Sequence, residues 1–192
     1  MLRIDGKRIY LRDHQASDLD VFHSWLSDPV IAQYLTWRTS TLEESFIKLA
    51  ESLREINTHP RTKYFLAMVL NDTHRIIGEA GFTIESKAEY GGVADLGYFL
   101  LKEYWGKGYA TEATEMMIRY CFTVLGLHKV TAECDAENRA SESVMKRCGM
   151  KREAYREKQY LLGGKWRDRL DYALLYEDWI TDGDLYETNR TV

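Results

Sequence analysis

A pair of glycines where an apolar run meets a helical pattern is the feature of this sequence that most directly suggests chemistry. Gly106 and Gly108 lie in the segment from Glu103 to Thr111, directly after the strand-like run 93–101. Glycines at such a junction allow the backbone amides to point at an anion held by the positive end of the helix. The segment therefore predicts a ligand that carries phosphate; the alternative is that the two glycines only form a tight turn.

The two common phosphate-binding motifs of nucleotide-binding proteins do not fit this segment. A Walker loop needs a glycine five residues before Gly106 and a hydroxyl residue after Lys107, but those positions hold Leu101 and Gly108. A dinucleotide fingerprint that begins at Gly106 needs glycine or alanine where Thr111 stands, and an acidic residue about 20 residues further on at a strand end. A dinucleotide-binding oxidoreductase is thereby weakened, although it remains a rival hypothesis.

Two acidic residues stand inside apolar, strand-like runs and are candidates for proton transfer. Glu79 lies in Ile-Ile-Gly-Glu-Ala-Gly-Phe, and Asp95 lies in Val-Ala-Asp-Leu-Gly-Tyr. Burial at such positions raises the pKa of a carboxyl group toward the range of a general base. Because residues alternate between the faces of a strand, each acid could instead face solvent, an alternative that carries more weight for Asp95.

The elements that must position these residues follow from the hydrophobic periodicity. The second helical pattern has the capping-box pair Thr41 and Glu44 ahead of an apolar face that includes Phe46 and Leu49. The pattern as a whole predicts an α/β fold, a mixed sheet of about seven strands with about four helices on its faces and a parallel strand, helix, strand unit at 93–134. Strands are expected at 8–12, 64–70, 76–84, 93–101, 129–134, 153–162 and 167–176, and helices at 19–26, 46–56, 113–124 and 138–148.

Composition narrows the class of protein without indicating an activity. The chain has 192 residues, of which 45% are hydrophobic, and this length favours a single domain that spans residues 1–192. Its formal net charge of −4 argues against a nucleic-acid partner. No run approaches the roughly 20 apolar residues of a membrane helix, and no signal peptide precedes Tyr10. Three cysteines form no disulfide framework and five histidines form no metal-like pairs, so we expect a cytoplasmic protein without a metal. Exposed strand edges and the terminal hairpin allow a homodimer.

Several ordered motifs resemble the GNAT superfamily of acetyl-coenzyme A (acetyl-CoA) dependent N-acetyltransferases, in particular its RimJ/RimL-like group. The pyrophosphate loop of that superfamily reads Gln/Arg-x-x-Gly-x-Gly/Ala, and the run from Glu103 to Gly108 fills it except at the first position. The resemblance covers nearly the whole chain. Further matching segments are Arg8-Ile-Tyr-Leu-Arg12, Leu96-Gly97-Tyr98, Tyr109-Ala-Thr-Glu-Ala113, the run from Glu137 to Ser141, and Cys148-Gly149-Met150.

The resemblance implies a fold and a binding mode for the cosubstrate. In GNAT proteins two parallel strands, here 93–101 and 129–134, splay apart, and the pantetheine arm of acetyl-CoA bonds to strand backbone in the gap. Lys107 is equally explained as a solvated lysine of the turn. The residues implied to contact acetyl-CoA are Trp105, Gly106, Lys107, Gly108, Tyr109, Ala110 and Thr111 in the loop, Leu100 or Leu101 at the splay as oxyanion donor, and Asn138.

The resemblance also suggests how proton transfers are shared. An alkyl amine near pKa 10 is protonated at neutral pH, so a carboxylate, or a water held by one, must remove a proton before attack; Glu79 and Asp95 are the candidates. Many family members place a tyrosine on the helix after the asparagine, but that position is Met145 here. RimJ/RimL-like members use a serine to stabilise the departing thiolate, which corresponds to Ser141. The alternative is that Ser141 is only a residue of the turn that caps the helix.

The sequence thus predicts an acetyl-CoA-dependent N-acetyltransferase that acts on a primary amine by direct attack in a ternary complex. The acceptor is a protein N-terminal amine or a small polyamine or aminoglycoside-like amine, and the net acidity slightly favours a cation. Tyr34 and Trp37, between the first two helices, are candidate acceptor contacts. The alternative function is a non-catalytic sensor or scaffold that binds coenzyme A through the same loop.

Overall fold

A single mixed sheet runs through the computed structural model, which describes residues 1–34, 41–89 and 91–181. The strand order is β1-β2-β3-β4-β5-β6-β8-β7, and of these neighbouring pairs β5 and β6 alone are parallel. The described residues form eight strands: β1 (Arg3–Asp5), β2 (Ile9–Asp13), β3 (Lys63–Leu70), β4 (Ile76–Ala88), β5 (Gly91–Leu100), β6 (Lys129–Asp135), β7 (Lys151–Leu162) and β8 (Lys165–Leu175).

The strand count is one higher than the sequence predicted. The additional strand is β1, which pairs antiparallel with β2 and places Ile4 opposite Leu11. Three residues are too few to give a period-two signal, because a strand is normally recognised from an alternation over four to eight residues. The predicted α/β class, the mixed sheet and the parallel unit are confirmed.

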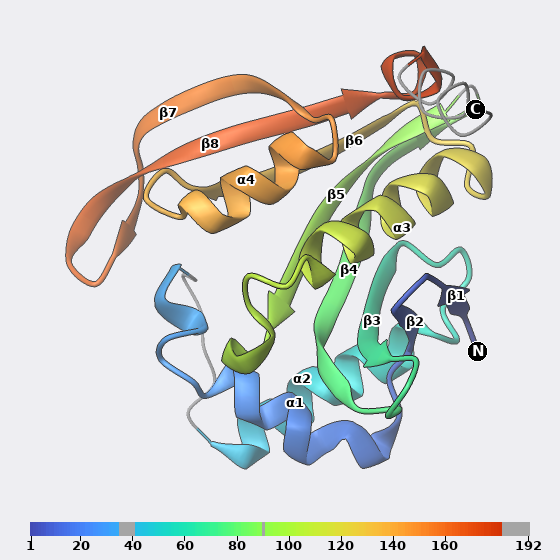
Figure 1. Cartoon of the computed structure of the whole chain (residues 1–192), viewed down its shortest axis with the longest axis vertical. Coiled ribbons are helices and arrows are strands. Elements are labelled where there is room, and N and C mark those ends of the chain that lie inside the picture. Colours follow the sequence, from blue (N-terminus) through green and yellow to red (C-terminus); the bar gives the residue numbers. More distant parts are fainter. Residues whose placement is uncertain (35–40, 90, 182–192) are drawn as a thin grey trace.

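Four α-helices, three short 3-10 turns and a helical segment at 176–181 make up the helical part of the described residues. The α-helices and 3-10 turns are α1 (Leu19–Leu26), α2 (Leu42–Glu55), α3 (Tyr109–Thr123), α4 (Arg139–Arg147), η1 (Ala16–Asp18), η2 (Ala32–Tyr34) and η3 (Lys102–Tyr104). Figure 1 shows α3 lying along β4 and β5, α4 beside β6 and β8, and α1 with α2 at the opposite end of the molecule from the β7–β8 hairpin. In the described residues, no helix has the length and apolarity that crossing a bilayer requires.

The alternation of the strands divides the apolar residues between the two faces of the sheet. On β2, Ile9 and Leu11 enter a large core that also contains Met117 of α3, whereas Tyr10 joins Ala67 in a small cluster on the other face. Burying one such large side chain stabilises the fold by about 1.5–3 kcal/mol. Side chains on one sheet face thus meet α3, and those on the other face are available to α1 and α2.

The orientation of α2 differs from the sequence expectation. The predicted capping box is confirmed, because Glu44 N donates to Thr41 Oγ1 (3.2 Å) and Thr41 N donates to Glu44 Oε2 (3.1 Å). Phe46, however, is 56% exposed, and the buried positions include Ser45 and Leu49. The side chain of Ser45 meets His23 Nδ1 at 2.8 Å. The rotation of α2 thus places Ser45, rather than Phe46, against α1, which apolar periodicity could not indicate.

The sheet opens between its two parallel strands. Pairing of β5 with β6 ends at Leu96 and Ala132, although β5 remains paired with β4 as far as Leu100 and β6 remains paired with β8 as far as Asp135. Beyond this point β5 is still paired with β4, and β6 is still paired with β8, but β5 and β6 are no longer paired with each other. Figure 1 shows the resulting V, with β5 on one arm and β6 and β8 on the other.

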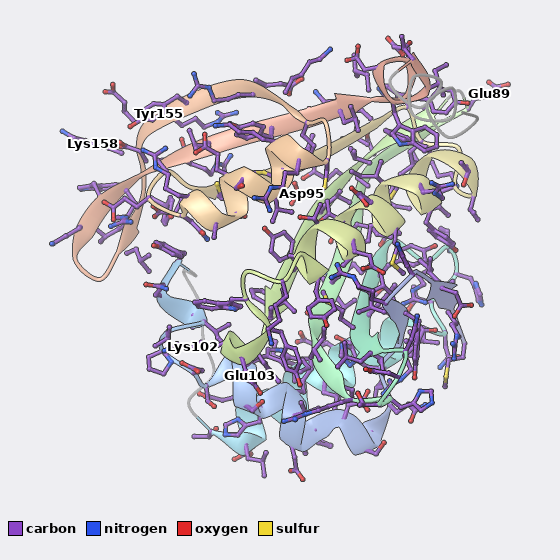
Figure 2. All side chains as sticks on the ribbon, in the orientation of Figure 1. Glu89, Asp95, Lys102, Glu103, Tyr155 and Lys158 are labelled. Carbon is purple, nitrogen blue, oxygen red and sulfur yellow. The ribbon has the colours of Figure 1, made fainter. Side chains whose placement is uncertain are left out.

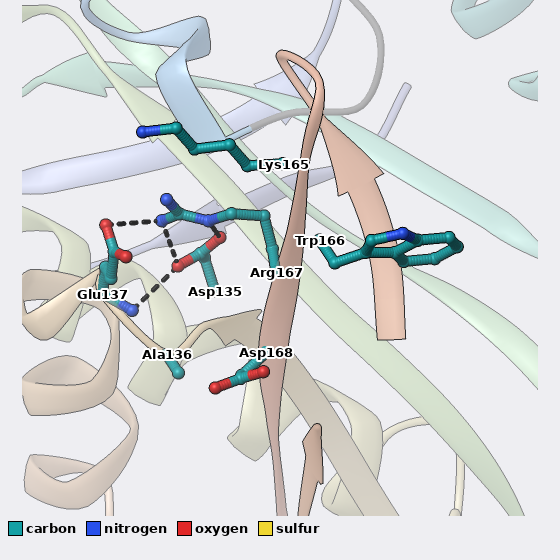
Figure 3. A pocket seen from close by; sticks show the side chains of 7 residues that line it. All are labelled: Asp135, Ala136, Glu137, Lys165, Trp166, Arg167 and Asp168. Atoms are coloured by element: carbon teal, nitrogen blue, oxygen red, sulfur yellow. Dashed lines mark hydrogen bonds and ion pairs between the residues drawn. The ribbon is translucent and has the colours of Figure 1, made fainter. Parts of the chain in front are cut away.

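An ion-pair network fastens the β7–β8 hairpin to the end of β6 (Figure 3). Arg167 donates to both oxygens of Asp135, through Nε (2.9 Å) and Nη2 (2.8 Å), and lies 2.7 Å from Glu137 Oε2. Burial alone would raise the pKa of Asp135, but the bonds from Arg167 and Tyr160 outweigh it and lower that pKa. The network holds the arm formed by β6 and β8 rigid where it diverges from β5.

Candidate active site

The V between the strands is part of a groove of about 1420 Å³. Its wall combines the end of α1, the segment after it, α2, the middle of β4, the second half of β5, the glycine loop, β6 and α4. These elements come from almost the whole length of the chain. The size is enough for a large cosubstrate together with an acceptor, because pockets for drug-sized ligands measure about 300–1,000 Å³.

The glycine loop leaves the first amides of α3 without a capping side chain. Gly106 and Gly108 both adopt left-handed conformations, with φ of 71° and 81°, and Gly108 is the N-cap of α3. By contrast α2 and α4 are capped by the side chains of Thr41 and Asn138. The first amides of a helix need a partner, and a bound anion can serve as that partner. A Cβ at Gly106 would meet no atom within 4 Å, so the space beside it is open.

The loop also contains a hydroxyl group without a hydrogen-bond partner, and an arginine side chain supports it from behind. Thr111 Oγ1 is buried and has no hydrogen-bond partner among the described residues. Behind the loop, Arg8 donates through Nη1 to the Lys107 carbonyl (2.8 Å) and through Nε to Glu112 Oε2 (2.7 Å). Arg8 therefore fixes the loop and neutralises the one acidic residue of the first turn of α3. An exposed anion-binding helix end with an unused hydroxyl fits the pyrophosphate of coenzyme A.

The backbone at the end of β5 distinguishes the two predicted oxyanion donors. Leu101 N donates to Ile77 O (2.9 Å), so this amide is engaged with β4. In an antiparallel ladder the amides alternate in direction, and the N–H of Leu100 therefore points to the opposite side, from which β6 has diverged. Leu100, and not Leu101, presents a donor to the gap.

Ser141 lies across the gap from a tyrosine that sequence reasoning did not single out. Tyr98 of β5 donates to Ser141 Oγ (3.1 Å), and Asn138 Oδ1 accepts from Ser141 N (3.1 Å). Burial raises the pKa of Tyr98 to about 12, so the phenol keeps its proton at neutral pH. The cap predicted for Asn138 is confirmed. Tyr98 could have been suspected from its place in the Leu-Gly-Tyr motif, but only its contact with Ser141 indicates a role.

The two candidate carboxylates occupy different levels of the groove. Glu79 is paired with Phe99 of β5, at the level where the strands have already separated. Asp95 is paired with Thr131 of β6, inside the closed part of the ladder, and accepts from Thr131 Oγ1 at 3.0 Å. Burial raises the pKa of Asp95 to about 6. Figure 2 shows Asp95 well removed from Lys102 and Glu103, which follow the end of β5.

Glu79 is supported by a charged cluster that the sequence did not reveal. The residue is only 8% exposed, lines the groove, and meets His14 Nε2 through Oε2 at 2.8 Å. His14 lies 3.4 Å from Asp18, which forms a two-pronged ion pair with Arg12. These partners are separated from Glu79 by more than 60 positions in the sequence, so no local motif marks them.

The remaining predicted residues lie partly in the groove. Tyr34 lines it, whereas Trp37 falls outside the described residues. Lys107 is exposed, with its Nζ 5.5 Å from the centre of the Tyr104 ring, and it does not line the groove. Trp105 donates through Nε1 to the Leu100 carbonyl (2.8 Å), which ties the loop to the end of β5. Tyr109 and Ala110 line the groove.

The three cysteines are free, buried and weakly acidic. Burial raises the pKa of each thiol to about 12. Only Cys134 of the three lines the groove. A thiol with so high a pKa forms little thiolate at neutral pH and is a poor nucleophile. The arrangement gives no support to a covalent acetyl-enzyme.

Comparison with known proteins shows which family this chain matches. Residues 8–151 match the protein-family model described as the acetyltransferase (GNAT) domain. The uncharacterized N-acetyltransferase YnaD of Bacillus subtilis is 29% identical over 93% of this chain and 99% of its own length. The ribosomal protein uS5-alanine N-acetyltransferase of Escherichia coli is 29% identical over 60% of this chain and 59% of its own length.

A solved structure agrees over a similar length. The crystal structure of a GNAT-family acetyltransferase from Bacillus anthracis superposes with a TM-score of 0.79 at 26% sequence identity. The match covers 92% of this chain and 99% of the other. The shared architecture extends beyond the segment that the family model matches, into the β7–β8 hairpin.

Proposed function

Because this chain belongs to the GNAT family and is an N-acetyltransferase that uses acetyl-CoA, we propose that it acetylates the primary amine of a cationic acceptor, first of all a protein N-terminus. The observation that carries the proposal is the buried carboxylate of Glu79, held in the groove at the level where β5 and β6 have separated. An ionised carboxylate there attracts an ammonium group and can remove its proton. The name of the Escherichia coli relative, an alanine N-acetyltransferase of ribosomal protein uS5, supports the N-terminal amine.

The cosubstrate side of the groove would bind and orient acetyl-CoA, which supplies an acetyl group activated as a thioester. The open amides from Gly106 to Thr111 and the Thr111 hydroxyl would hold the pyrophosphate. The N–H of Leu100 would donate a hydrogen bond to the thioester carbonyl oxygen, where negative charge develops during attack. Asn138 would hold the start of α4 and, with it, Ser141.

Glu79 would act as general base for the amine. At neutral pH an N-terminal amine, with a pKa near 8, is largely protonated, and an alkyl amine is almost fully so. Glu79 would take that proton directly or through one water, leaving the nitrogen lone pair free to form the C–N bond as the C–S bond breaks. Asp95 is a weaker candidate, because Thr131 already occupies one of its oxygens inside the closed ladder.

Ser141 would return a proton to the departing thiolate. Its Oγ accepts a hydrogen bond from Tyr98, so its own hydroxyl proton is available to another acceptor. Tyr98 retains its proton because burial raises its pKa to about 12, and it could then resupply the serine. The two hydroxyl groups therefore form a short proton path that reaches from β5 to α4.

Turnover with a panel of amines tests this function. Purified protein is mixed with acetyl-CoA and with peptides that have free N-termini, with spermidine, or with an aminoglycoside, and the release of free thiol is followed. Peptides of the same sequence that are already Nα-acetylated serve as controls. We expect release with free N-termini and none with the blocked peptides. Release with spermidine alone would move the acceptor to the polyamines, and binding of acetyl-CoA without release for any amine would overturn the proposal.

A further inference from the structure

We propose that His14 is a positioning residue for acetyl transfer, which holds the Glu79 carboxylate in place from inside the protein, while Asp18, paired with Arg12, lies behind the imidazole. This inference rests on the proposed function, in which Glu79 removes the proton of the acceptor amine. It assigns a role in the reaction to side chains that do not touch the groove.

The geometry is that of a buried chain of charges leading to the groove. His14 is 1% exposed and Asp18 is 3% exposed. The imidazole contacts Glu79 Oε2 through Nε2 (2.8 Å) and lies 3.4 Å from Asp18 Oδ2 through Nδ1. Arg12 closes the chain, with Nη1 2.7 Å and Nη2 2.9 Å from the two oxygens of Asp18. Of these four charged side chains, Glu79 alone lines the groove.

Two carboxylates, those of Asp18 and Glu79, determine the protonation state of His14. Asp18 of η1 and Glu79 of β4 are the charged groups that face it, and α1 contributes the rings of Phe22 and Trp25, at 5.2 and 6.4 Å between centroids. Burial disfavours the imidazolium, but the two carboxylates outweigh burial and raise the pKa of His14 to about 9. His14 is therefore protonated at neutral pH.

Stability alone does not account for such an arrangement. A buried ion pair is often no more stabilising than well-packed apolar residues of the same volume. Here the pair has a consequence for the reaction. The imidazolium fixes one carboxylate oxygen of Glu79 and leaves the other for the amine side.

The substitution His14→Gln separates charge from packing. Glutamine can still donate a hydrogen bond but carries no charge, so the charge-assisted contact with Glu79 is lost while a neutral hydrogen bond can still form. We expect kcat/KM for the amine to fall roughly 10- to 100-fold. The dissociation constant of acetyl-CoA should not change. His128→Gln, at an exposed position before β6 that does not line the groove, is the control and should leave kcat/KM unchanged.

A double-mutant cycle and a spectroscopic measurement distinguish the possible failures. If His14 acts through Glu79, the His14→Gln/Glu79→Gln double variant will be no slower than Glu79→Gln alone. The ring ¹⁵N signals of His14 should titrate with a pKa well above its usual value in the wild type, and with a lower pKa in Glu79→Gln. This second readout needs neither turnover nor a folded His14 variant.

The possible results of these experiments distinguish failure of the proposed function from failure of the role of His14. Normal kcat in Glu79→Gln would remove Glu79 as the base and refute that part of the proposed function. A slow Glu79→Gln enzyme together with a His14→Gln enzyme as fast as the wild type would leave the proposed function intact and overturn the role of His14. Additive losses in the double variant, or an ordinary His14 pKa in the wild type, would also overturn it.

Discussion

The two sides of the groove are built in opposite ways. The side proposed to bind acetyl-CoA is made largely of backbone from one continuous segment, Glu103 to Thr111, whose glycines adopt left-handed conformations. The side proposed for the acceptor is made of side chains, with Glu79 of β4 in contact with His14, and His14 beside Asp18. A site made of backbone leaves a short motif, because particular residues permit particular dihedral angles. A site made of packed charges leaves no motif.

The largest effect is expected at the backbone site. Gly108→Val places a branched residue at φ of 81°, with its Cβ about 3.3 Å from Arg8 Nη2, and disturbs the amides that are proposed to hold the pyrophosphate. Loss of two charge-assisted hydrogen bonds, about 4 kcal/mol, corresponds to a roughly 1,000-fold weaker acetyl-CoA affinity. Calorimetric titration measures it. Gly164→Val imposes the same strain at φ of 79° in the distant hairpin turn and should bind normally; equal loss in both variants would contradict the loop assignment.

The charged cluster predicts a pH-dependent stability. The pKa of His14 is raised from 6.5 to about 9, which corresponds to about 3 kcal/mol. Since the folded state holds this proton more tightly, the contribution is fully present below pH 6.5 and is lost as the pH rises through about 9. Urea unfolding across this range should show a decline in the wild type that is absent in His14→Gln. Parallel curves would show that His14 is not held protonated by its neighbours.

The hydroxyl pair that joins the two sides should have a moderate effect. Ser141→Ala removes the proton donor of the thiolate, but a thiol has a pKa near 8.5 and leaves readily without help. We therefore expect kcat to fall roughly tenfold with little change in acetyl-CoA affinity. Tyr98→Phe should lower kcat less. Ser143→Ala, on the same helix and also in the groove wall, is the control; a Ser141→Ala enzyme as fast as the control would exclude the serine.

The smallest effect is expected for Asp95, the acid inside the closed part of the ladder. Asp95→Asn keeps the shape of the side chain and its contact with Thr131, so kcat should change by less than about twofold. Above pH 6 the variant should be slightly more stable than the wild type, because burial raises the pKa of Asp95 to about 6 and thus disfavours the ionised form. A loss in kcat comparable with that of Glu79→Gln would make Asp95 the base instead.

Much of the fold could be predicted because its signals are local. The period-two runs at 64–70 and 129–134 correspond to β3 and β6, and the capping residues Thr41 and Asn138 lie where their helices begin. The exceptions have physical reasons. β1 is too short to show an alternation, and Phe46 is exposed in a helix whose neighbouring Ser45 faces His23 of α1.

The candidate site likewise contains residues that the sequence alone indicates and contacts that only the folded structure reveals. Gly106, Gly108 and Asn138 could be assigned from the sequence, because φ above zero and helix capping demand particular residue types. The choice of Leu100 over Leu101 depends on which amide the ladder has already used. The contact of Tyr98 with Ser141 depends on where α4 lies against β5. Both are properties of packing.

By itself, the sequence determined the kinds of element, their order, the glycine turn before α3 and, through its resemblance to GNAT proteins, the reaction class. Those properties follow from backbone angles and periodicity, which act over a few residues. Only the tertiary structure decided which acid is next to the gap and which charges support it. A carboxylate such as Glu79 acquires its chemical character from its neighbours, and folding brings His14 to it from 65 positions away.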